Sequence, residues 1–244
     1  MHDLLAGRFA AWATAWLAGR TSTDAAIDAL SDDRAHRVAG VPGTEGAVPL
    51  SWALTALRGL GERRVRLVLP VPGDVRGLPP APGLAALALE AGQAAVGERV
   101  ALVPESAGPE VVAWTAVDLA GVPPAPPAAE GTLRALSGAL DLAVGDAART
   151  LARLDLARWH PEVPALLTGL GEAGAPDLPP GTDPLAVSVL ARARRLARVL
   201  DLATADAPGG AVTRGQAAAR DEALRPLADA VREATAAAYN AVPR

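Results

Sequence analysis

The segment LVLPVPGDVRGLPPAPG, residues 67–83, places Asp74 and Arg76 in a loop rich in Gly and Pro directly after an apolar run. This pair could hold a small anion, because a guanidinium forms a two-pronged contact with a carboxylate or phosphate. The amides of such a loop can add an anion-binding nest. The alternative is a structural turn, in which Asp74 accepts hydrogen bonds from neighbouring amides. We expect the structural turn and keep ligand binding as the rival interpretation.

A second basic candidate is the segment RARRLAR, which places four arginines within two helical turns. Two of them, Arg194 and Arg198, are one helical turn apart and therefore share a face. In the rival interpretation they join Asp74 and Arg76 as ligand-binding residues in a cleft between two structural units. The alternative is a solvated helix face, or one whose arginines pair with acids of neighbouring helices. We favour this alternative.

Other motifs lack the context that their chemistry requires. GLGEAG, residues 169–174, matches G-x-G-x-x-G, but a helical segment precedes it and prolines follow where the phosphate-binding helix would begin. Ser106 lacks the leading glycine of a nucleophile elbow. The histidines His2, His36 and His160 have no partners at metal-ligand spacing. We therefore expect no catalytic residue, no metal site and no cofactor.

The composition excludes further classes of function. All 23 basic residues are arginine and cysteine is absent, so lysine Schiff bases, P-loop lysines, disulfides and thiolate chemistry cannot occur. The net charge of −4 argues against binding to nucleic acid or anionic lipid. Arginine without lysine, together with abundant Ala, Gly and Pro, is typical of a GC-rich bacterial genome.

No segment predicts insertion into a membrane. The longest apolar-rich run, residues 9–18, is far shorter than the roughly 20 residues that a membrane-spanning helix needs. The first residues lack the basic head and unbroken apolar stretch of a signal peptide. We therefore expect a soluble, cytoplasmic protein.

The elements that must position these residues begin with helices. Residues 3–19 place Leu5, Phe9, Trp12 and Trp16 on one stripe, which we expect to be buried. Further helices are predicted from Thr21–Thr23, from Pro49 and from near Pro82. Strands are predicted at 64–71, 93–96, 99–103 and 110–118. The last two form a hairpin, and 110–118 is apolar on both faces, which predicts a central strand.

The prolines of GVPPAPPAA, residues 121–129, predict a linker. Residues 1–120 would then form an N-terminal α+β unit, with a small, mostly antiparallel sheet flanked by helices. Residues 130–244 would form a helical C-terminal unit. The fold class is therefore α+β.

The function that best fits this pattern is a non-catalytic protein–protein interaction or regulatory module, because every common catalytic device is missing or out of context. Its partner would be another protein or a second copy of the chain. The alternative is a small-ligand or anion-binding protein, or an enzyme of unrecognised type, that uses the cleft between the two units.

Overall fold

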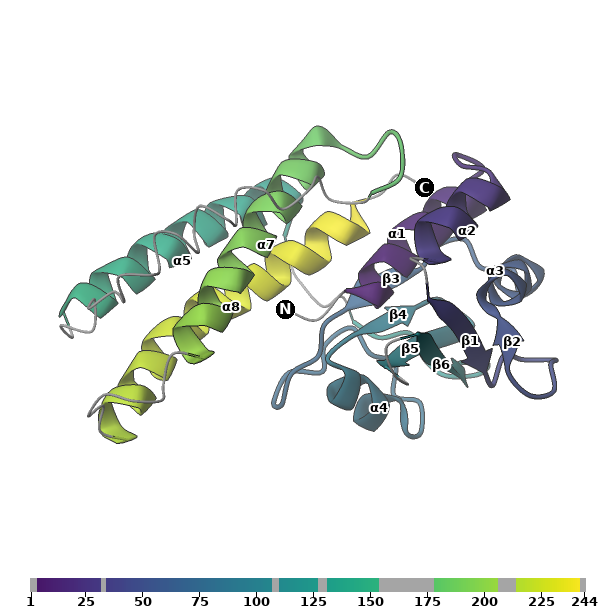
Figure 1. The fold of residues 1–244 in the computed structure, drawn as a ribbon, viewed down its shortest axis with the longest axis horizontal. Coiled ribbons are helices and arrows are strands. Elements are labelled where there is room, and N and C mark those ends of the chain that lie inside the picture. Colours follow the sequence, from purple (N-terminus) through teal and green to yellow (C-terminus); the bar gives the residue numbers. More distant parts are fainter. Residues whose placement is uncertain are drawn as a thin grey trace. The chain divides into compact units, whose positions relative to one another are not determined.

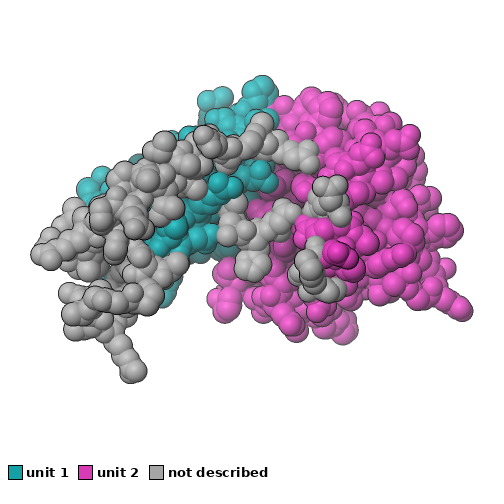
Figure 2. Space-filling model, viewed as in Figure 1, with its two compact units in different colours: residues 1, 131–176, 184–238 teal, residues 2–130, 177–183, 239–244 magenta. Residues whose placement is uncertain are grey.

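The computed structural model describes residues 4–31, 34–106, 110–126, 131–153, 178–205 and 214–241. The chain divides into two compact units (Figure 2). The first, called the sheet-bearing unit, comprises residues 2–130, 177–183 and 239–244. The second, called the helical unit, comprises residues 1, 131–176 and 184–238.

The sheet-bearing unit combines short helices with one mixed sheet. Its helices are α1 (Leu5–Leu17), α2 (Thr23–Ser31), α3 (Leu50–Gly59) and α4 (Leu84–Ala91). Its strands are β1 (Ala35–Ala39), β2 (Val48–Pro49), β3 (Arg66–Val68), β4 (Ala94–Val96), β5 (Val100–Ser106) and β6 (Val111–Asp118).

The strands form a sheet in the order β2-β1-β6-β5-β4-β3. The β1–β6 pair is parallel, and the other pairs of neighbours are antiparallel. The hairpin predicted for residues 99–118 is confirmed as β5 and β6. The central position predicted for 110–118 is also confirmed, since β6 lies between β1 and β5.

Different helices pack on the two faces of the sheet. α1 and α4 lie on opposite faces (Figure 1). α1 packs against β3, β4 and β5, whereas α4 packs against β5. The stripe predicted on α1 is buried as expected: Leu5, Phe9, Trp12 and Trp16 are each no more than 8% exposed. On the opposite face, Leu84 and Ala88 of α4 pack in a core cluster with strand residues of β3, β4 and β5.

The free edge of β3 is closed by side chains. The Thr14 hydroxyl accepts the N–H of Val65 and donates to its carbonyl, at 3.0 Å in both cases. The side-chain amide of Asn240 forms the same two hydrogen bonds with Leu67. Its Oδ1 accepts the backbone N–H of Leu67 at 2.7 Å, and its Nδ2 donates to the Leu67 carbonyl at 3.0 Å. An open edge strand invites pairing with another chain, so these two side chains protect the edge.

The helical unit contains α5 (Leu133–Arg153), α7 (Pro184–Ala205) and most of α8 (Arg214–Asn240). α5 packs against α7, and an ion pair between Asp141 and Arg192 joins them. α8 continues through Pro226 as one helix. Its last two residues, Tyr239 and Asn240, belong to the sheet-bearing unit. None of the helices in the described ranges has the length and apolar character that a membrane crossing requires.

The predicted fold class is confirmed: α+β, with a mostly antiparallel sheet in the N-terminal part and helices in the C-terminal part. The strands β1 and β2 were not predicted. The exposed positions of β1 are Ala35, Arg37 and Ala39, so small side chains weaken the alternation that marks a strand. β3 is shorter than the predicted 64–71, because its one partner strand, β4, has three residues, which pair with Arg66–Val68.

Candidate functional site

The loop after β3 is a tight turn. Val71 and Asp74 exchange backbone hydrogen bonds at 3.0 and 2.8 Å. Gly73 lies inside this turn with φ +89° and Gly77 follows with φ +91°. These left-handed conformations favour glycine, because a Cβ would clash with the backbone there. Glycine is thus required for the shape of the loop itself.

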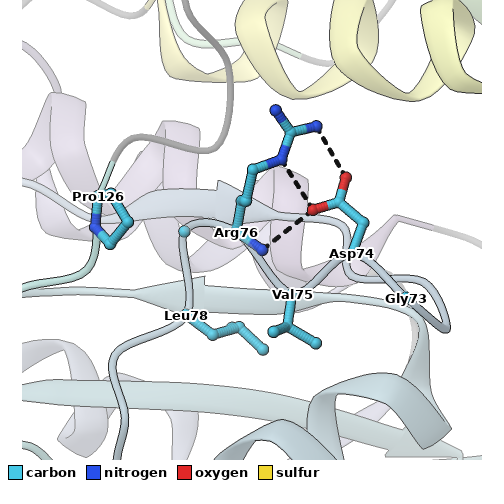
Figure 3. Close-up of a pocket in the computed structure, with 7 residues that line it drawn as sticks. Gly73, Asp74, Val75, Arg76, Leu78 and Pro126 are labelled. Carbon is cyan, nitrogen blue, oxygen red and sulfur yellow. Dashed lines mark hydrogen bonds and ion pairs between the residues drawn. The ribbon is translucent and has the colours of Figure 1, made fainter.

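Asp74 and Arg76 are brought together in this loop (Figure 3). Asp74 Oδ1 accepts from Arg76 Nε at 2.9 Å and from the Arg76 backbone N–H at 3.2 Å, while Oδ2 accepts from Nη2 at 2.9 Å. The Arg76 side chain is 53% exposed and that of Asp74 only 19%. A ligand would therefore compete with Asp74 for the guanidinium.

The pair borders an open surface depression of about 580 Å³ (Figure 3). The lining residues are Gly73, Asp74, Val75, Arg76, Gly77, Leu78 and Pro126. Asp74 and Arg76 are the charged residues among them, and they neutralise each other. The depression can therefore offer a ligand one carboxylate–guanidinium pair and an apolar floor that includes Leu78.

We expect Arg76→Ala to change the free energy of unfolding by at most about 1 kcal/mol, because exposed ion pairs contribute little. Urea unfolding of the two proteins measures the difference. A loss of several kcal/mol would show that the pair holds the loop and its surroundings together.

We expect Gly73→Val to cost about 1–3 kcal/mol, because a β-branched residue is strained at positive φ. Apart from Gly73 itself and its two chain neighbours, no heavy atom lies within 4 Å of a Cβ built there, so local backbone strain is the only expected cause. Gly59→Val is the matched control, since Gly59 ends α3 without a positive φ and also has open space around its Cβ position. Equal losses at both positions would contradict the strain argument.

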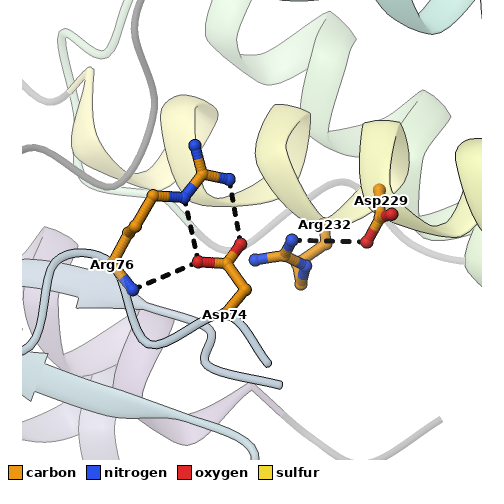
Figure 4. Close-up of polar contacts among 4 residues, drawn as sticks. All are labelled: Asp74, Arg76, Asp229 and Arg232. Atoms are coloured by element: carbon orange, nitrogen blue, oxygen red, sulfur yellow. Dashed lines mark hydrogen bonds and ion pairs between the residues drawn. The ribbon is translucent and has the colours of Figure 1, made fainter. Parts of the chain in front are cut away.

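Arg194 and Arg198 lie one turn apart on α7, and both are half-buried. Elsewhere in the helical unit, arginines pair with acids, as Arg192 does with Asp141 and Arg232 with Asp229, the latter at 3.3 Å. Figure 4 draws the Arg232–Asp229 pair of the helical unit and the Asp74–Arg76 pair of the sheet-bearing unit, and each pair forms within its own unit. Such pairing fits the intramolecular alternative considered for the arginines of α7.

The remaining sequence candidates fall into two groups. GLGEAG at 169–174, His2 and His160 lie outside the described residues. His36 is buried, and its Nδ1 accepts a hydrogen bond from Trp114 Nε1 at 3.1 Å. His36 is therefore part of the core of the sheet-bearing unit. Within the described ranges, no group of three or more His, Cys, Asp or Glu residues could hold a metal ion.

Sequence reasoning did not single out Glu62, which is only 4% exposed. Its carboxylate accepts the backbone N–H groups of Glu98, Arg99 and Val100, at 2.7, 2.6 and 3.1 Å. The turn between β4 and β5 is therefore an anion-binding nest that a carboxylate of the same chain already fills. Because the Glu62 carboxylate is buried and already accepts three amides, we interpret it as a structural clamp that holds this turn, not as a ligand-binding group.

Sequence reasoning also missed Trp52 on α3, which is 58% exposed. Trp12, Trp16 and Trp114 of the same unit are each no more than 8% exposed. Val75 and Leu142 are the other large apolar side chains that stand out as exposed in the described part of the chain. The helical spacing of α3 could have revealed Trp52, since it lies opposite the buried leucines of that helix.

These observations define an α+β protein whose described residues show a solvent-exposed aromatic side chain and a shallow surface depression, with buried polar groups that serve the fold. Comparison with known families then identifies its group. Residues 6–130 match the N-terminal domain, and residues 134–236 the C-terminal domain, of the Rv1486c-like proteins. The chain therefore belongs to the Rv1486c-like protein family.

Two curated relatives show how far the similarity extends. "Uncharacterized protein Rv1486c" of Mycobacterium tuberculosis is 32% identical, over 95% of this chain and 94% of the relative. "Uncharacterized protein ML1804" of Mycobacterium leprae is 28% identical over the same shares of the two chains. No solved structure matches this chain. The similarity to the relatives thus covers both parts of the chain.

Proposed function

We propose that this protein is a non-catalytic interaction module that binds another protein through α3, with Trp52 as the anchor. The observation that carries the proposal is the 58% exposure of the Trp52 side chain. A tryptophan offers a large apolar surface and one hydrogen-bond donor, and buried tryptophans dominate the energetic centres of many interfaces. Covering Trp52 with a partner is therefore favourable.

The side of α3 that packs on the fold is opposite to the side that carries Trp52. Leu50, Leu54 and Leu57 are each no more than 6% exposed and attach the helix to the unit. At roughly 100° per residue, Trp52 lies about 200° from Leu50, on the opposite side of the helix. Trp52 thus contributes little to the core that holds α3.

The partner expected from this chemistry is a protein surface with an apolar pocket and a carbonyl or carboxylate oxygen for the indole N–H. A regulatory role would follow from occupancy of that surface by such a partner. A second copy of the chain is one candidate partner, and an unrelated protein is the other.

The experiment compares capture by the immobilised wild-type chain, by Trp52→Ala and by Thr55→Ala. Thr55 is exposed on the same helix and serves as the matched control. A protein captured by the wild type is identified and purified, and its affinity is measured by calorimetry. We expect Trp52→Ala to weaken binding at least tenfold, and Thr55→Ala to leave it within about twofold. Equal affinities for all three would contradict a role of α3.

A second candidate function is the binding of a small anion, and the depression beside Asp74 and Arg76 is the observation that favours it. Inorganic phosphate and sulfate are the probes, with the melting temperature as the readout. Binding would raise the melting temperature saturably, and Arg76→Ala would abolish that rise. Arg194→Ala and Arg198→Ala test the cations of α7 in the same assay. The interaction module predicts no saturable shift in any of these proteins.

A further inference from the structure

Among the residues that the structure describes, α4 packs on the half of its sheet face that β3, β4 and β5 form. Strand register identifies this face, because cross-strand neighbours project to the same side. Val103 of β5 is buried in the core cluster with α4, and it pairs with Thr115 of β6. Thr115 pairs in turn with Ala39 of β1. Alternate residues of β6 and β1 therefore continue the same face beyond α4.

We call this continuation the open half-face. Its residues on β1 are exposed and those on β6 are half-buried. The intervening residues along each of these strands point to the other face of the sheet and are buried. It consists of Ala35, Arg37, Ala39, Glu105, Val111, Ala113 and Thr115. Its middle is made of small and β-branched side chains, as in the interior of a packed pair of sheets.

α3 does not cover this half-face, because it lies with α1 on the other side of the sheet. The guanidinium of Arg58 on α3 stacks 3.7 Å from the centre of the Trp16 ring of α1. The same guanidinium donates to the Trp16 carbonyl at 2.9 Å. The open half-face is therefore separate from the surface that carries Trp52.

Two opposite charges flank the centre of the open half-face. Arg37 pairs with Ala113, and Ala113 pairs with Glu105, so the three residues form one row across β1, β6 and β5. Neighbouring strands are about 4.8 Å apart, which separates the Cα atoms of Arg37 and Glu105 by about 10 Å. Ala113 leaves a low point between them. Both charged residues are exposed.

This row is complementary to itself. A twofold axis that runs along β6 exchanges the two sides of the row, so Arg37 of one copy faces Glu105 of the second copy, and the reverse. Ala113 then faces Ala113 at the centre. Two sheets can approach to about 10 Å and bury side chains between them in this arrangement. A partner without this symmetry would have to supply both charges independently.

We propose that two copies of this chain associate through the open half-face, with the twofold axis along β6 and reciprocal contacts between Arg37 and Glu105. The inference rests on the proposed role as an interaction module, and it names a second copy as the partner at this surface. The second copy covers β1 and β6 in the way that α4 covers the other half of the sheet.

Sedimentation velocity of the full chain over a concentration series tests the proposal. The wild type sediments as a reversible monomer–dimer mixture. Ala113→Glu places two like charges together at the centre and removes the dimer. Ala86→Glu is the matched control, because Ala86 is exposed on α4, and it leaves the dimer unchanged. A monomeric wild type, or a dimer that resists Ala113→Glu in a folded protein, overturns the proposal.

Charge exchange provides a second test that does not depend on how well Ala113→Glu folds. Arg37→Glu and Glu105→Arg each place like charges opposite one another twice per dimer, and each raises the dissociation constant about tenfold or more. The double variant restores opposite charges and returns the dissociation constant to within about threefold of the wild type. Failure of the double variant to restore association overturns the proposal.

The results of these experiments distinguish failure of the proposed dimer from failure of the proposed binding through Trp52. Loss of partner binding in Trp52→Ala with a monomeric wild type leaves the interaction module standing and removes the proposed dimer. A dimer that Trp52→Ala disrupts and the charge exchanges do not affect assigns self-association to α3, and this also overturns the proposal for the open half-face.

Discussion

Replacing Trp114 by alanine is expected to lower the free energy of unfolding by about 3–5 kcal/mol, as for other large buried aromatics. Trp114 is 2% exposed on the central strand β6. Its ring centroid lies 5.4 Å from that of Phe9, and its Nε1 donates to His36 Nδ1 at 3.1 Å. The substitution therefore removes a core volume and leaves His36 without that hydrogen bond. Urea unfolding followed by circular dichroism gives the difference.

The same substitution at Trp52 is the control. Trp52→Ala is expected to change the free energy of unfolding by no more than about 0.5 kcal/mol, because the side chain is exposed. Similar losses at both positions would mean that Trp52 holds α3 in place. In that case the exposure of Trp52 would no longer argue for a binding role.

Glu62→Ala is expected to cost about 3–5 kcal/mol, because it strips a carboxylate from three backbone amides at once. The amides of Glu98, Arg99 and Val100 lie in the turn between β4 and β5, and that of Val100 is buried. Their donors would be left without an acceptor, and a cavity would form where the side chain had been. The loss is measured by chemical unfolding.

Two further variants separate the clamp from simple loss of volume. Glu62→Gln keeps the shape but turns one acceptor into a donor, so it should cost clearly less than Glu62→Ala and more than a surface change. Gly97→Ala should also be destabilising, because its Cβ would lie 2.3 Å from Glu62 Oε1. If Glu62→Gln were as stable as the wild type, the amides would not depend on the carboxylate.

Local patterns along the chain predicted much of the fold. The stripe on α1 and the two apolar faces of β6 identified a buried helix and a central strand, because each depends on residues close together in sequence. Likewise, the proline at the start of α3 predicted the beginning of a helix, and the apolar run of β5 predicted a strand. The fold class followed from these elements.

Contacts between distant residues could not be predicted. Asn240 satisfies the backbone of Leu67 across 173 positions, and Glu62 reaches the amide of Arg99 across 37 positions. Neither residue belongs to a periodic pattern, so no local rule marks it. The strand β1 was missed because its small side chains weaken the alternation of a strand, and its parallel pairing with β6 joins residues more than 70 positions apart.

In the candidate sites, too, local features could be predicted and features that depend on distant residues could not. The turn at Asp74 could be predicted from its own residues, and the structure contains the expected hydrogen bond from the Arg76 backbone N–H to Asp74. The exposure of Trp52 depends on what packs over α3, which the sequence does not state. The helical wheel of α3 places Trp52 opposite Leu50, and this was the available signal.

The most direct test of a docking role for α3 is photo-crosslinking in cells from benzoylphenylalanine introduced at position 52. The same probe at position 86, exposed on α4 on the opposite face of the sheet, serves as the reference. The proposal predicts a discrete cross-linked protein species from position 52 that is much weaker from position 86. No cross-linked species from position 52, or the same species at equal yield from both positions, would contradict it.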